Sequence, residues 1–562
     1  MDYVKLAHML FPEDLPTVEE CFASYPKRIL PQGAQVTRVA PSPTGFLHIG
    51  TVYQAFINKL IAYHSGGVFF MRLEDTDCKR EVQNAGDIAY NMLSYFGLKP
   101  DEGYRGSSER QVGEYGDYVQ SKRQKIYMAF AKHLVSIGKA FPCFCQVSGS
   151  KEDVLKRREE ELAESDDIDG KDPCRNLSME QIEYNLSLGM PFAIRLKSEG
   201  NGEKKFKFKD EIKGEREIRE NSKDIVILKS NKIPPYSLAH VVDDTLMGTT
   251  MVVRGEEWYP SLAAHLELFR AFGLKPPKYA HTPVISKIDE SGNKRKVSKR
   301  KDPEADARYF VEQGYPVGSV MEYLLNLINS DYEDFRRANP DKSYYEFPFK
   351  VSKIGSNNPM FDFQKLDDCS KQVISRLSAQ EIYNNLLAWA EKFDKSFYEK
   401  IANMKDFCIK LFSIDREGKN PRKDISKWSE VEKLYSYMFY STKDLDLSEY
   451  DFDSKFSCEE IISALKSYKN VFNMSDDKQM WFDRIKSLCS TLGFADNMKD
   501  FRQNPEKYKG SVADLSGIVR VALTTKRNTP DLYFIMQLLG REEIVARLDN
   551  VISLLSKKAS KK

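Results

Sequence analysis

The sequence predicts an α/β domain built on a parallel sheet, split by an insertion and followed by an all-helical region. Three observations support this prediction. Two apolar runs flank a helix-period segment near the start, further strand-like runs follow beyond residue 190, and helical periodicity dominates after about residue 361. A chain of 562 residues is too long for one hydrophobic core. About three or four structural units are therefore expected.

The predicted elements follow one another in a recognisable order. Residues 1–33 are amphipathic and helical in pattern, and they end at a break containing Pro31 and Gly33. "QVTRVA" and "GGVFFMRLED" are typical of strands, with a helix over about 49–64 between them, which is the unit of a parallel sheet. "SKRQKIYMAFAKHLVSIG" predicts a helix, and "PFAIRLK", "DIVILKS" and "TTMVVRGEE" predict strands. The charged run over 151–172 predicts a solvated helix and loop.

The bulk composition is that of an ordinary soluble globular protein. The formal net charge is +2, which neither demands nor excludes a nucleic-acid partner, because charged patches rather than totals bind nucleic acid. No apolar run approaches the roughly 18 residues of a membrane span, and no signal peptide is evident. Nine cysteines scattered over so long a chain are not the pattern of a disulfide framework. We therefore expect a cytoplasmic protein.

The stretch "RVAPSPTGFLHIGTVYQAF" joins the first predicted strand to the first predicted helix through a turn stiffened by prolines. A helix N-terminus leaves amide hydrogens unpaired and carries partial positive charge, so it is a natural seat for phosphate. His48 would add a donor there, and Gly50 would let a flat ligand such as adenine lie against the backbone. The alternative is a simple N-capping turn with a solvent-facing histidine.

A second candidate is the basic run "KRKVSKRKD" in a loop-like context after "DESGN". Such a run is often only solvated surface. However, Lys296, Ser298 and Lys299 form a K-x-S-K pattern suited to neutralising a triphosphate. Lysines on a loop could stabilise the charge that develops on a leaving diphosphate.

Together, "APSPTGFLHIG" and "KVSKR" resemble the HIGH and KMSKS motifs of class I aminoacyl-tRNA synthetases. "MRLEDTD", "AHVVDDTLMGTTMVVRGEEW" and "VRVALTTKRNTPDLYFIMQLLG" occur in the order expected of the bacterial-type glutamate–tRNA ligase family. The resemblance covers nearly everything from Arg38 onward. The chain departs from the motifs at Thr51, which replaces the second histidine of HIGH, and at Val297 and Arg300 in the second motif.

The resemblance implies a class I synthetase fold: a Rossmann-like catalytic domain split by an insertion, followed by a helical anticodon-binding region. The extension before Arg38 has no role that the sequence indicates beyond packing on the α/β domain. The implied divisions are a helical extension over 1–37, the catalytic domain over 38–113 and 223–273, an inserted tRNA acceptor-binding domain over 114–222, a KMSKS loop and stem-contact region over 274–375, and an anticodon-binding domain over 376–562.

A glutamate pocket needs at least one carboxylate and more than one cation. Arg38 and Arg254 match the family's pattern, and a guanidinium can bond both oxygens of a carboxylate. By resemblance, Glu74 would pair with the substrate ammonium and Tyr236 would wall the pocket, with Ala40 and Ser42 beside them.

Two further positions bear on the amino-acid substrate. His240 stands where relatives often carry asparagine, so it is either a substrate contact or a packed core residue. Glutaminyl-tRNA synthetases, the nearest alternative, usually have a "PEPNG" turn in place of "PSPTG" and lack an arginine at position 254. A desolvated guanidinium facing a neutral amide would cost on the order of a few kcal/mol. Arg254 therefore favours glutamate over glutamine.

The resemblance implies two steps: glutamate and ATP form glutamyl-adenylate and diphosphate, and the glutamyl group then passes to tRNA-Glu. Magnesium would arrive with ATP. Whether tRNA-Gln is also charged stays open, and we expect a monomer without a membrane partner.

The catalytic residues would be His48, Gly50, Lys296 and Lys299. The ATP site would comprise Pro41, Ser42, Thr44, Gly45, His48, Gly50, Thr51, Lys296, Ser298 and Lys299.

Two further patterns complete the expectations. Cys143, Cys145 and Cys174 resemble part of a C-x-C…C-x-H zinc site found in some relatives, but the fourth position is Asn176, a poor ligand. Reduced buried cysteines are therefore expected rather than zinc. "NPRKDISKW" combines cations with an indole, and "TTKRNTPDL" places cations after an apolar run. Both patterns suit contacts with the anticodon of a tRNA, although either segment alone is also ordinary surface.

Overall fold

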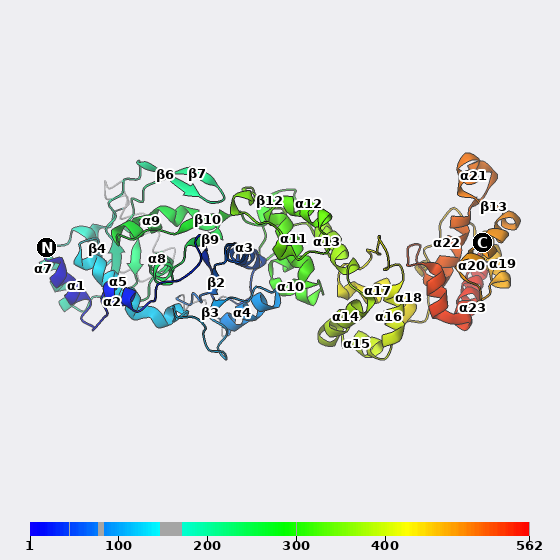
Figure 1. Cartoon of the computed structure of the whole chain (residues 1–562), viewed down its shortest axis with the longest axis horizontal. Helices are drawn as coiled ribbons and strands as arrows, with labels where there is room; N and C mark the ends of the chain where they lie inside the picture. Colours follow the sequence, from blue (N-terminus) through cyan, green and yellow to red (C-terminus); the bar gives the residue numbers. More distant parts are fainter. Residues whose placement is uncertain (44, 77–81, 83, 146–170, 299, 561–562) are drawn as a thin grey trace. The chain divides into compact units, whose positions relative to one another are not determined.

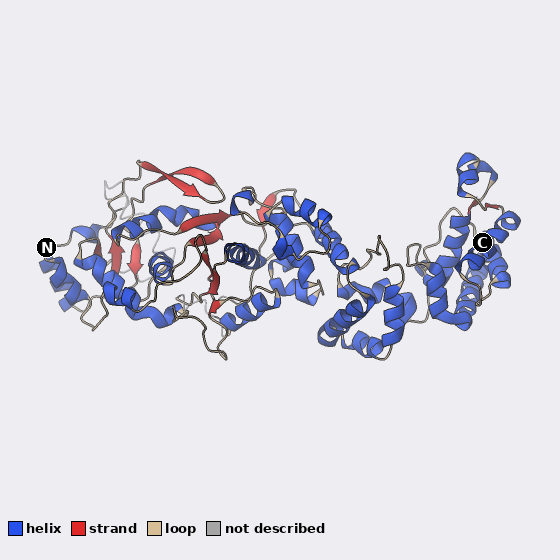
Figure 2. Cartoon of the chain, viewed as in Figure 1, coloured by secondary structure: helices blue, strands red, loops and turns tan. Residues whose placement is uncertain are grey.

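The computed structural model describes the whole chain except residues 44, 77–81, 83, 146–170, 299 and 561–562. It divides into two compact units, 1–310 with 321–362, and 311–320 with 363–562. Almost all strands lie in the first unit, and the second is helical apart from two very short strands (Figure 2). The fold-class prediction, an α/β part followed by a helical part, is thereby confirmed.

The centre of the first unit is a parallel sheet (Figure 1). β1 (Val36–Val39) pairs with β2 (Val68–Met71), which pairs with β3 (Glu102–Gly103). On the other side β9 (Met251–Gly255) lies beside β1, where the Thr250 N–H donates to the Val36 carbonyl at 3.0 Å, and β10 (Lys278–Thr282) pairs with β9. In such sheets ligands bind at the carboxyl ends of the strands, where the strand order reverses.

The first strand–helix–strand unit forms as its sequence predicts. β1 is buried throughout, and α3 (Ile49–Ser65) packs an apolar face on the sheet. The helix ends at Gly66, which has a φ of 66°. At the next residue, Gly67, a Cβ would fall 1.9 Å from the Gln35 carbonyl oxygen. The paired glycines therefore let the chain turn directly from α3 into β2.

The insertion separates β3 from β9 and contributes its own strands. β4 (Ala140–Cys143), β5 (Ala193–Leu196) and β8 (Val226–Leu228) form an antiparallel sheet. β6 (Lys205–Asp210) and β7 (Gly214–Arg219) form a hairpin, and the last residue of β6 joins the central sheet where Asp210 pairs with Tyr279 of β10. Between β3 and β9 the chain also forms the helices α5 (Gln124–Ser136), α7 (Met179–Ser187) and α8 (Tyr236–Leu246), and α9 (Leu262–Ala271) follows β9.

The N-terminal extension packs on the α/β unit. It forms two short helices, α1 (Tyr3–Leu10) and α2 (Val18–Ala23), and residues 26–31 have no regular structure. The buried face of α1 joins the same apolar cluster as α5. Beyond the helices, both Nη atoms of Arg28 donate to the Glu102 carboxylate at 3.1 and 2.9 Å. The extension therefore reaches β3 of the central sheet.

The remaining elements complete both units, and those after residue 361 are mostly helical, as the sequence periodicity predicts. Up to residue 362 these are α4 (Ala85–Tyr95), β11 (Ser286–Ile288), β12 (Lys294–Lys296), α10 (Ala307–Glu312), α11 (Val317–Ile328) and α12 (Asp331–Ala338). The second unit contains α13 (Phe363–Ser375), α14 (Ala379–Phe393), α15 (Lys395–Ala402), α16 (Lys405–Ser413), α17 (Val431–Leu434), α18 (Ser436–Phe439), α19 (Cys458–Val471), α20 (Lys478–Leu492), β13 (Phe494–Ala495), α21 (Met498–Gln503), β14 (Gly510–Ser511), α22 (Val512–Thr524) and α23 (Leu532–Ala559).

Two chain-wide expectations concern membranes and cysteines. Within the described ranges, every helix is too short or too polar to cross a membrane. The eight cysteines that the structure describes are all free thiols. The charged run over 151–172 lies almost wholly outside the described residues.

Candidate active site

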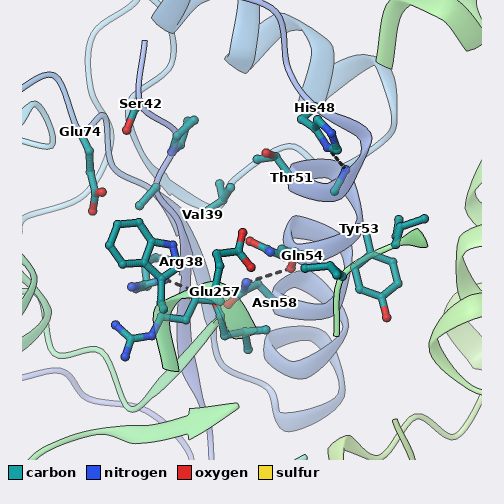
Figure 3. A pocket seen from close by; sticks show the side chains of 18 of the residues that line it. Arg38, Val39, Ser42, His48, Thr51, Tyr53, Gln54, Asn58, Glu74 and Glu257 are labelled. Atoms are coloured by element: carbon teal, nitrogen blue, oxygen red, sulfur yellow. Dashed lines mark hydrogen bonds between the residues drawn. The ribbon is translucent and has the colours of Figure 1, made fainter. Parts of the chain in front are cut away.

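A cavity of about 310 Å³ opens at the carboxyl ends of β1 and β9, next to the start of α3 (Figure 3). It brings together most of the residues that the sequence singled out. Of the predicted set, those that line it are Arg38, Ala40, Pro41, Ser42, His48, Gly50, Thr51, Glu74, Tyr236, Arg254 and Lys296.

Some predicted residues lie elsewhere. Gly45 and Ser298 are not among the residues that line the cavity. Thr44 and Lys299 fall outside the described residues. The cavity also has lining residues that sequence reasoning missed, including Tyr53, Gln54 and Asn58 on α3 and the Glu257–Trp258 pair after β9. Helical spacing from Gly50 could have indicated Gln54 and Asn58, because positions four apart share a helix face.

His48 is the N-cap of α3. Its Nδ1 atom accepts a hydrogen bond from the Gly50 N–H at 2.9 Å, so the ring proton of the neutral histidine is on Nε2. A Cβ at position 50 would lie 3.0 Å from that same Nδ1 atom. The histidine therefore both caps the helix and lines the cavity. The sequence offered a capping role and a ligand-binding role as alternatives, and this position is compatible with both.

Arg38 projects from β1 into a buried cluster of charges. Its Nε donates to Asp244 at 3.1 Å, and Arg72 Nη1 donates to the same carboxylate at 2.9 Å. Burial disfavours the Arg38 charge, but Asp244 more than offsets this effect, so the pKa of Arg38 lies above its ordinary value. The Arg38 charge is thus already matched by a protein carboxylate.

Glu74 lies in the segment that follows β2. Arg72 Nη2 donates to Glu74 Oε1 at 3.0 Å. Burial raises the pKa of Glu74, and the nearby charges of Arg72 and Arg38 limit that rise. Among the described residues this cavity-lining carboxylate accepts from one guanidinium nitrogen, so it is well placed to accept from a ligand ammonium as well.

Arg254, on β9, has a different environment from Arg38. Its Nε donates to His281 at 3.0 Å, and its Nη1 donates to His265 at 3.1 Å and to Tyr236 at 3.3 Å. Burial lowers the pKa of both histidines, so these partners are neutral. The buried Nη2 atom has no hydrogen-bond partner among the described residues.

Within the described part of the chain, no carboxylate forms an ion pair with Arg254. A buried guanidinium without a counter-charge is costly, and a ligand carboxylate would match its charge and its planar fork. The cavity therefore contains one arginine that is neutralised by the protein and one that is not.

His240 is a packed core residue and does not line the cavity. It is fully buried, and its ring bridges Asp244 at 2.5 Å and the Tyr279 hydroxyl at 2.9 Å. Of the two alternatives for this position, the structure supports the core residue.

The basic side chains of the second motif have different partners in the structure. Arg295 is tied to Asp302 through both Nη atoms at 2.6 and 2.7 Å, and the same carboxylate accepts from the Ser298 N–H at 2.8 Å. Lys296 instead faces the cavity, where its Nζ lies 3.2 Å from Glu257. Both side chains of this pair are about half exposed, so the contact is weak and easily exchanged.

A second cluster lies in the insertion, at the end of β4. The ligand atoms of Cys143, Cys145, Asp172 and Cys174 all lie within 4.8 Å of one another. The Sγ atoms of Cys145 and Cys174 are 3.3 Å apart, and Cys143 Sγ is 3.4 Å from Asp172 Oδ2. Hydrogen bonds with the other two thiols hold the pKa of Cys143 below its ordinary value.

This cluster fits a tetrahedral metal. With Zn–S of about 2.3 Å and Zn–O of about 2.0 Å, ligand atoms lie roughly 3.5–3.8 Å apart. The sequence pattern predicts Asn176 at the fourth position, and this prediction is wrong: the fourth member is Asp172, which comes before Cys174. Its Oδ1 accepts from the Cys174 N–H at 3.0 Å at the start of the short 3₁₀ helix Pro173–Asn176. Its Oδ2 lies 3.4 Å from Cys143 Sγ and also forms an ion pair with Arg195 Nε at 2.8 Å.

The segments suggested for anticodon contacts serve the fold of the second unit. Trp428 is only 5% exposed, so its indole is not presented to RNA. Lys526 Nζ donates to the carbonyls of Lys433 and Leu434, and Arg527 donates to the carbonyl of Asp451.

Comparison with known proteins identifies the family. A model of the family described as tRNA synthetases class I (E and Q), catalytic domain, matches residues 35–366. A model described as an anticodon binding domain matches residues 422–552. The chain is 42% identical to the glutamate–tRNA ligase of Clostridium perfringens over 558 residues, covering 99% of this chain and 100% of the relative.

This chain belongs to the glutamate–tRNA ligase family. The ligase of Acetivibrio thermocellus is likewise 42% identical, over 98% of this chain and all of the relative. Among solved structures, a glutamate tRNA ligase from Elizabethkingia meningosepticum in complex with its amino acid aligns with a TM-score of 0.71 and 22% identity, covering 93% of this chain and 100% of that one. That likeness supports the class I fold, and the chain is an enzyme of this class.

Proposed function

We propose that the enzyme activates L-glutamate with ATP and then transfers the glutamyl group to the terminal adenosine of tRNA-Glu. The observation that carries the proposal is Arg254, a buried guanidinium whose described partners are all neutral. Glutamate supplies a side-chain carboxylate for it, whereas the neutral amide of glutamine would leave the charge unmatched at a cost on the order of a few kcal/mol.

In the first step an oxygen of the substrate α-carboxylate attacks the α-phosphate of ATP, and diphosphate leaves. Arg254 takes the side-chain carboxylate, Glu74 accepts from the ammonium, and Arg38, Ala40, Ser42 and Tyr236 shape the pocket around them. Because the protein supplies no nucleophile, catalysis depends on positioning and on charge stabilisation.

The ATP side of the cavity lies at the start of α3. Gly50 gives the adenine a bare backbone surface, His48 Nε2 donates to the phosphates, and Lys296 leaves Glu257 to neutralise the diphosphate as it forms. Lys299 would act with Lys296, as in the family's second motif. Magnesium accompanies ATP. The remaining residues proposed for the ATP site are Pro41, Ser42, Thr44, Gly45, Thr51 and Ser298.

We further propose that Cys143, Cys145, Asp172 and Cys174 hold a structural zinc ion. The donor set, three sulfur atoms and one carboxylate oxygen, suits zinc, and four protein ligands close the coordination shell. When bound, the metal would tie the end of β4 to the segment before α7. The eight described cysteines form no disulfide bond, which suits a reducing compartment, and we place the enzyme in the cytoplasm as a monomer.

Charging assays test the function directly. The purified enzyme is incubated with ATP, magnesium and labelled glutamate, and tRNA-Glu and tRNA-Gln transcripts are supplied in separate reactions. We expect tRNA-Glu to be charged; charging of tRNA-Gln as well would identify a non-discriminating enzyme. Charging with labelled glutamine, and none with glutamate, would refute both the assigned substrate and the role of Arg254.

A further inference from the structure

The guanidinium of Arg254 donates a hydrogen bond to His281, and this contact requires one tautomer of the histidine ring. A guanidinium only donates hydrogen bonds, so His281 Nε2, 3.0 Å from Arg254 Nε, must be an unprotonated acceptor. The ring proton of a neutral His281 is then on Nδ1. This tautomer is a requirement of the contact, because the other one would set two N–H groups against each other.

Asp210 fixes that tautomer. His281 Nδ1 lies 2.6 Å from Asp210 Oδ2, and both residues are buried. The carboxylate is itself anchored at the end of β6, where Oδ1 accepts from the backbone N–H groups of Ile212 and Lys213, each at 2.9 Å. Burial opposes its ionisation, but the hydrogen bonds from His281 and from this turn hold the pKa of Asp210 below its ordinary value.

The second histidine at Arg254 has no such support. His265 Nδ1 accepts from Arg254 Nη1, but its Nε2 atom is buried without a hydrogen-bond partner among the described residues. Of the two rings that contact the guanidinium, His281 is the one that hydrogen-bonds a carboxylate within the described part of the chain. Orientation of Arg254 Nε therefore depends on the Asp210–His281 pair.

We propose that Asp210 and His281 are positioning residues for Arg254, which set the guanidinium for the side-chain carboxylate of the substrate. This inference rests on the proposed function. Neither residue lines the cavity, so they act through Arg254 and not by touching the substrate. Asp210 belongs to the inserted β6–β7 hairpin, so the insertion supplies a part of the amino-acid site.

The first test is Asp210→Asn in the full-length enzyme, assayed by aminoacylation. An amide can present either its oxygen or its NH₂ to His281 and so no longer fixes the tautomer. We expect the KM for glutamate to rise about tenfold or more while kcat changes little, because the Arg254 contact is present in both ground and transition states. The KM values for ATP and tRNA should stay within about twofold.

A double-mutant cycle separates positioning from general loss of structure. In His281→Gln the side-chain oxygen can accept from Arg254 without any tautomer to fix, so the KM for glutamate should stay within a few-fold of wild type. Adding Asp210→Asn to this variant should then have little further effect, whereas His281→Leu should raise KM as Asp210→Asn does. Such non-additivity is expected only of residues that act through each other.

Lys205→Met is the matched control, since it removes an exposed contact with Glu217 on the same hairpin. Its glutamate KM should equal that of wild type. The inference is wrong if Asp210→Asn raises glutamate KM no more than this control, if it raises ATP KM equally, or if its effect persists undiminished in the His281→Gln background. Absence of glutamate charging by the wild-type enzyme would instead refute the proposed function.

Discussion

His48 accepts, through Nδ1, a hydrogen bond from the backbone N–H of Gly50, two residues further along the chain. This bond orients the imidazole so that Nε2 is its donor, and it uses an amide hydrogen that would otherwise be unpaired at the helix start. The glycine leaves just enough room for the ring, because a Cβ at that position would lie 3.0 Å from the same nitrogen.

Gly50→Ala should therefore displace the His48 ring and cover the backbone surface assigned to adenine. We expect kcat/KM for ATP to fall about 10- to 100-fold, comparable with the loss of one donor from a preorganised anion site. Diphosphate exchange in the presence of tRNA measures the effect. Gly517→Ala in α22, where a Cβ meets nothing within 4 Å, is the control and should leave exchange unchanged. Equal activity of the two variants would contradict the role of Gly50.

Arg254→Lys tests whether the planar fork as well as the charge is needed. Lysine retains a cation but cannot bond both carboxylate oxygens. We expect kcat/KM for glutamate to fall about 100-fold in this variant and further in Arg254→Met, corresponding to roughly 3 kcal/mol or more of lost binding. Steady-state aminoacylation with varied glutamate gives the values. Retention of wild-type glutamate kcat/KM by Arg254→Met would refute the pocket assignment.

Much of this site could be predicted from the sequence because its parts are local. The strand, proline turn and helix from Arg38 to His48 are contiguous, and periodicity and turn chemistry define them. The second motif likewise identified Lys296 through its spacing. These predictions required no knowledge of which distant elements meet.

The surroundings of Arg254 could not be predicted in the same way. His265 and His281 approach it from α9 and β10, and Asp210 comes from the inserted hairpin. Asp172 was missed for another reason: the resemblance directed attention to Asn176, after Cys174, whereas the helix-capping carboxylate precedes that cysteine. Long-range pairing and cap geometry are set by tertiary packing, which a single sequence does not reveal.

Asp172→Ala tests the zinc proposal by a readout other than activity. We expect one zinc per chain in the wild-type enzyme by elemental analysis and at least tenfold weaker retention in the variant, because a structural site needs its fourth ligand. Cobalt substitution should give the visible spectrum of a tetrahedral thiolate site in the wild type only. Asn176→Ala is the control and should retain the metal. Zinc-free wild-type protein, or equal retention in Asp172→Ala, would refute the proposal.

Arg28→Met tests whether the N-terminal extension stabilises the catalytic unit. The Arg28 guanidinium bonds both oxygens of Glu102 and lies 3.8 Å from the centre of the Tyr115 ring. Its removal leaves a largely buried carboxylate without this partner, so we expect a loss of about 2 kcal/mol in the free energy of unfolding. Urea unfolding measures it. Lys5→Met, on the same extension, removes an exposed pair with Glu183 of α7 and should change stability by less than about 0.5 kcal/mol. Equal effects would show that Arg28 has no special role.

His240 makes the stability of the first unit depend on pH. Burial lowers its pKa from 6.5 to about 4, even though Asp244 favours the charged ring, and the charges of Arg254 and Arg38 lower it further. In the unfolded chain the ring binds a proton below about pH 6.5, whereas in the folded chain it stays neutral until about pH 4. The unfolded state therefore binds more protons in this window, and stability falls as the pH is lowered through it.

His240→Asn should remove this dependence. Between pH 7 and pH 5 the wild-type chain should lose about 2 kcal/mol through this one group, in addition to losses from His265 and His281, which shift in the same direction. Urea unfolding of the first unit at both pH values gives the difference, and the Asn variant should lose correspondingly less. His8→Asn, on the exposed face of α1, is the control and should behave as wild type. An equal pH-dependent loss in His240→Asn and wild type would show that the buried ring is not the titrating group.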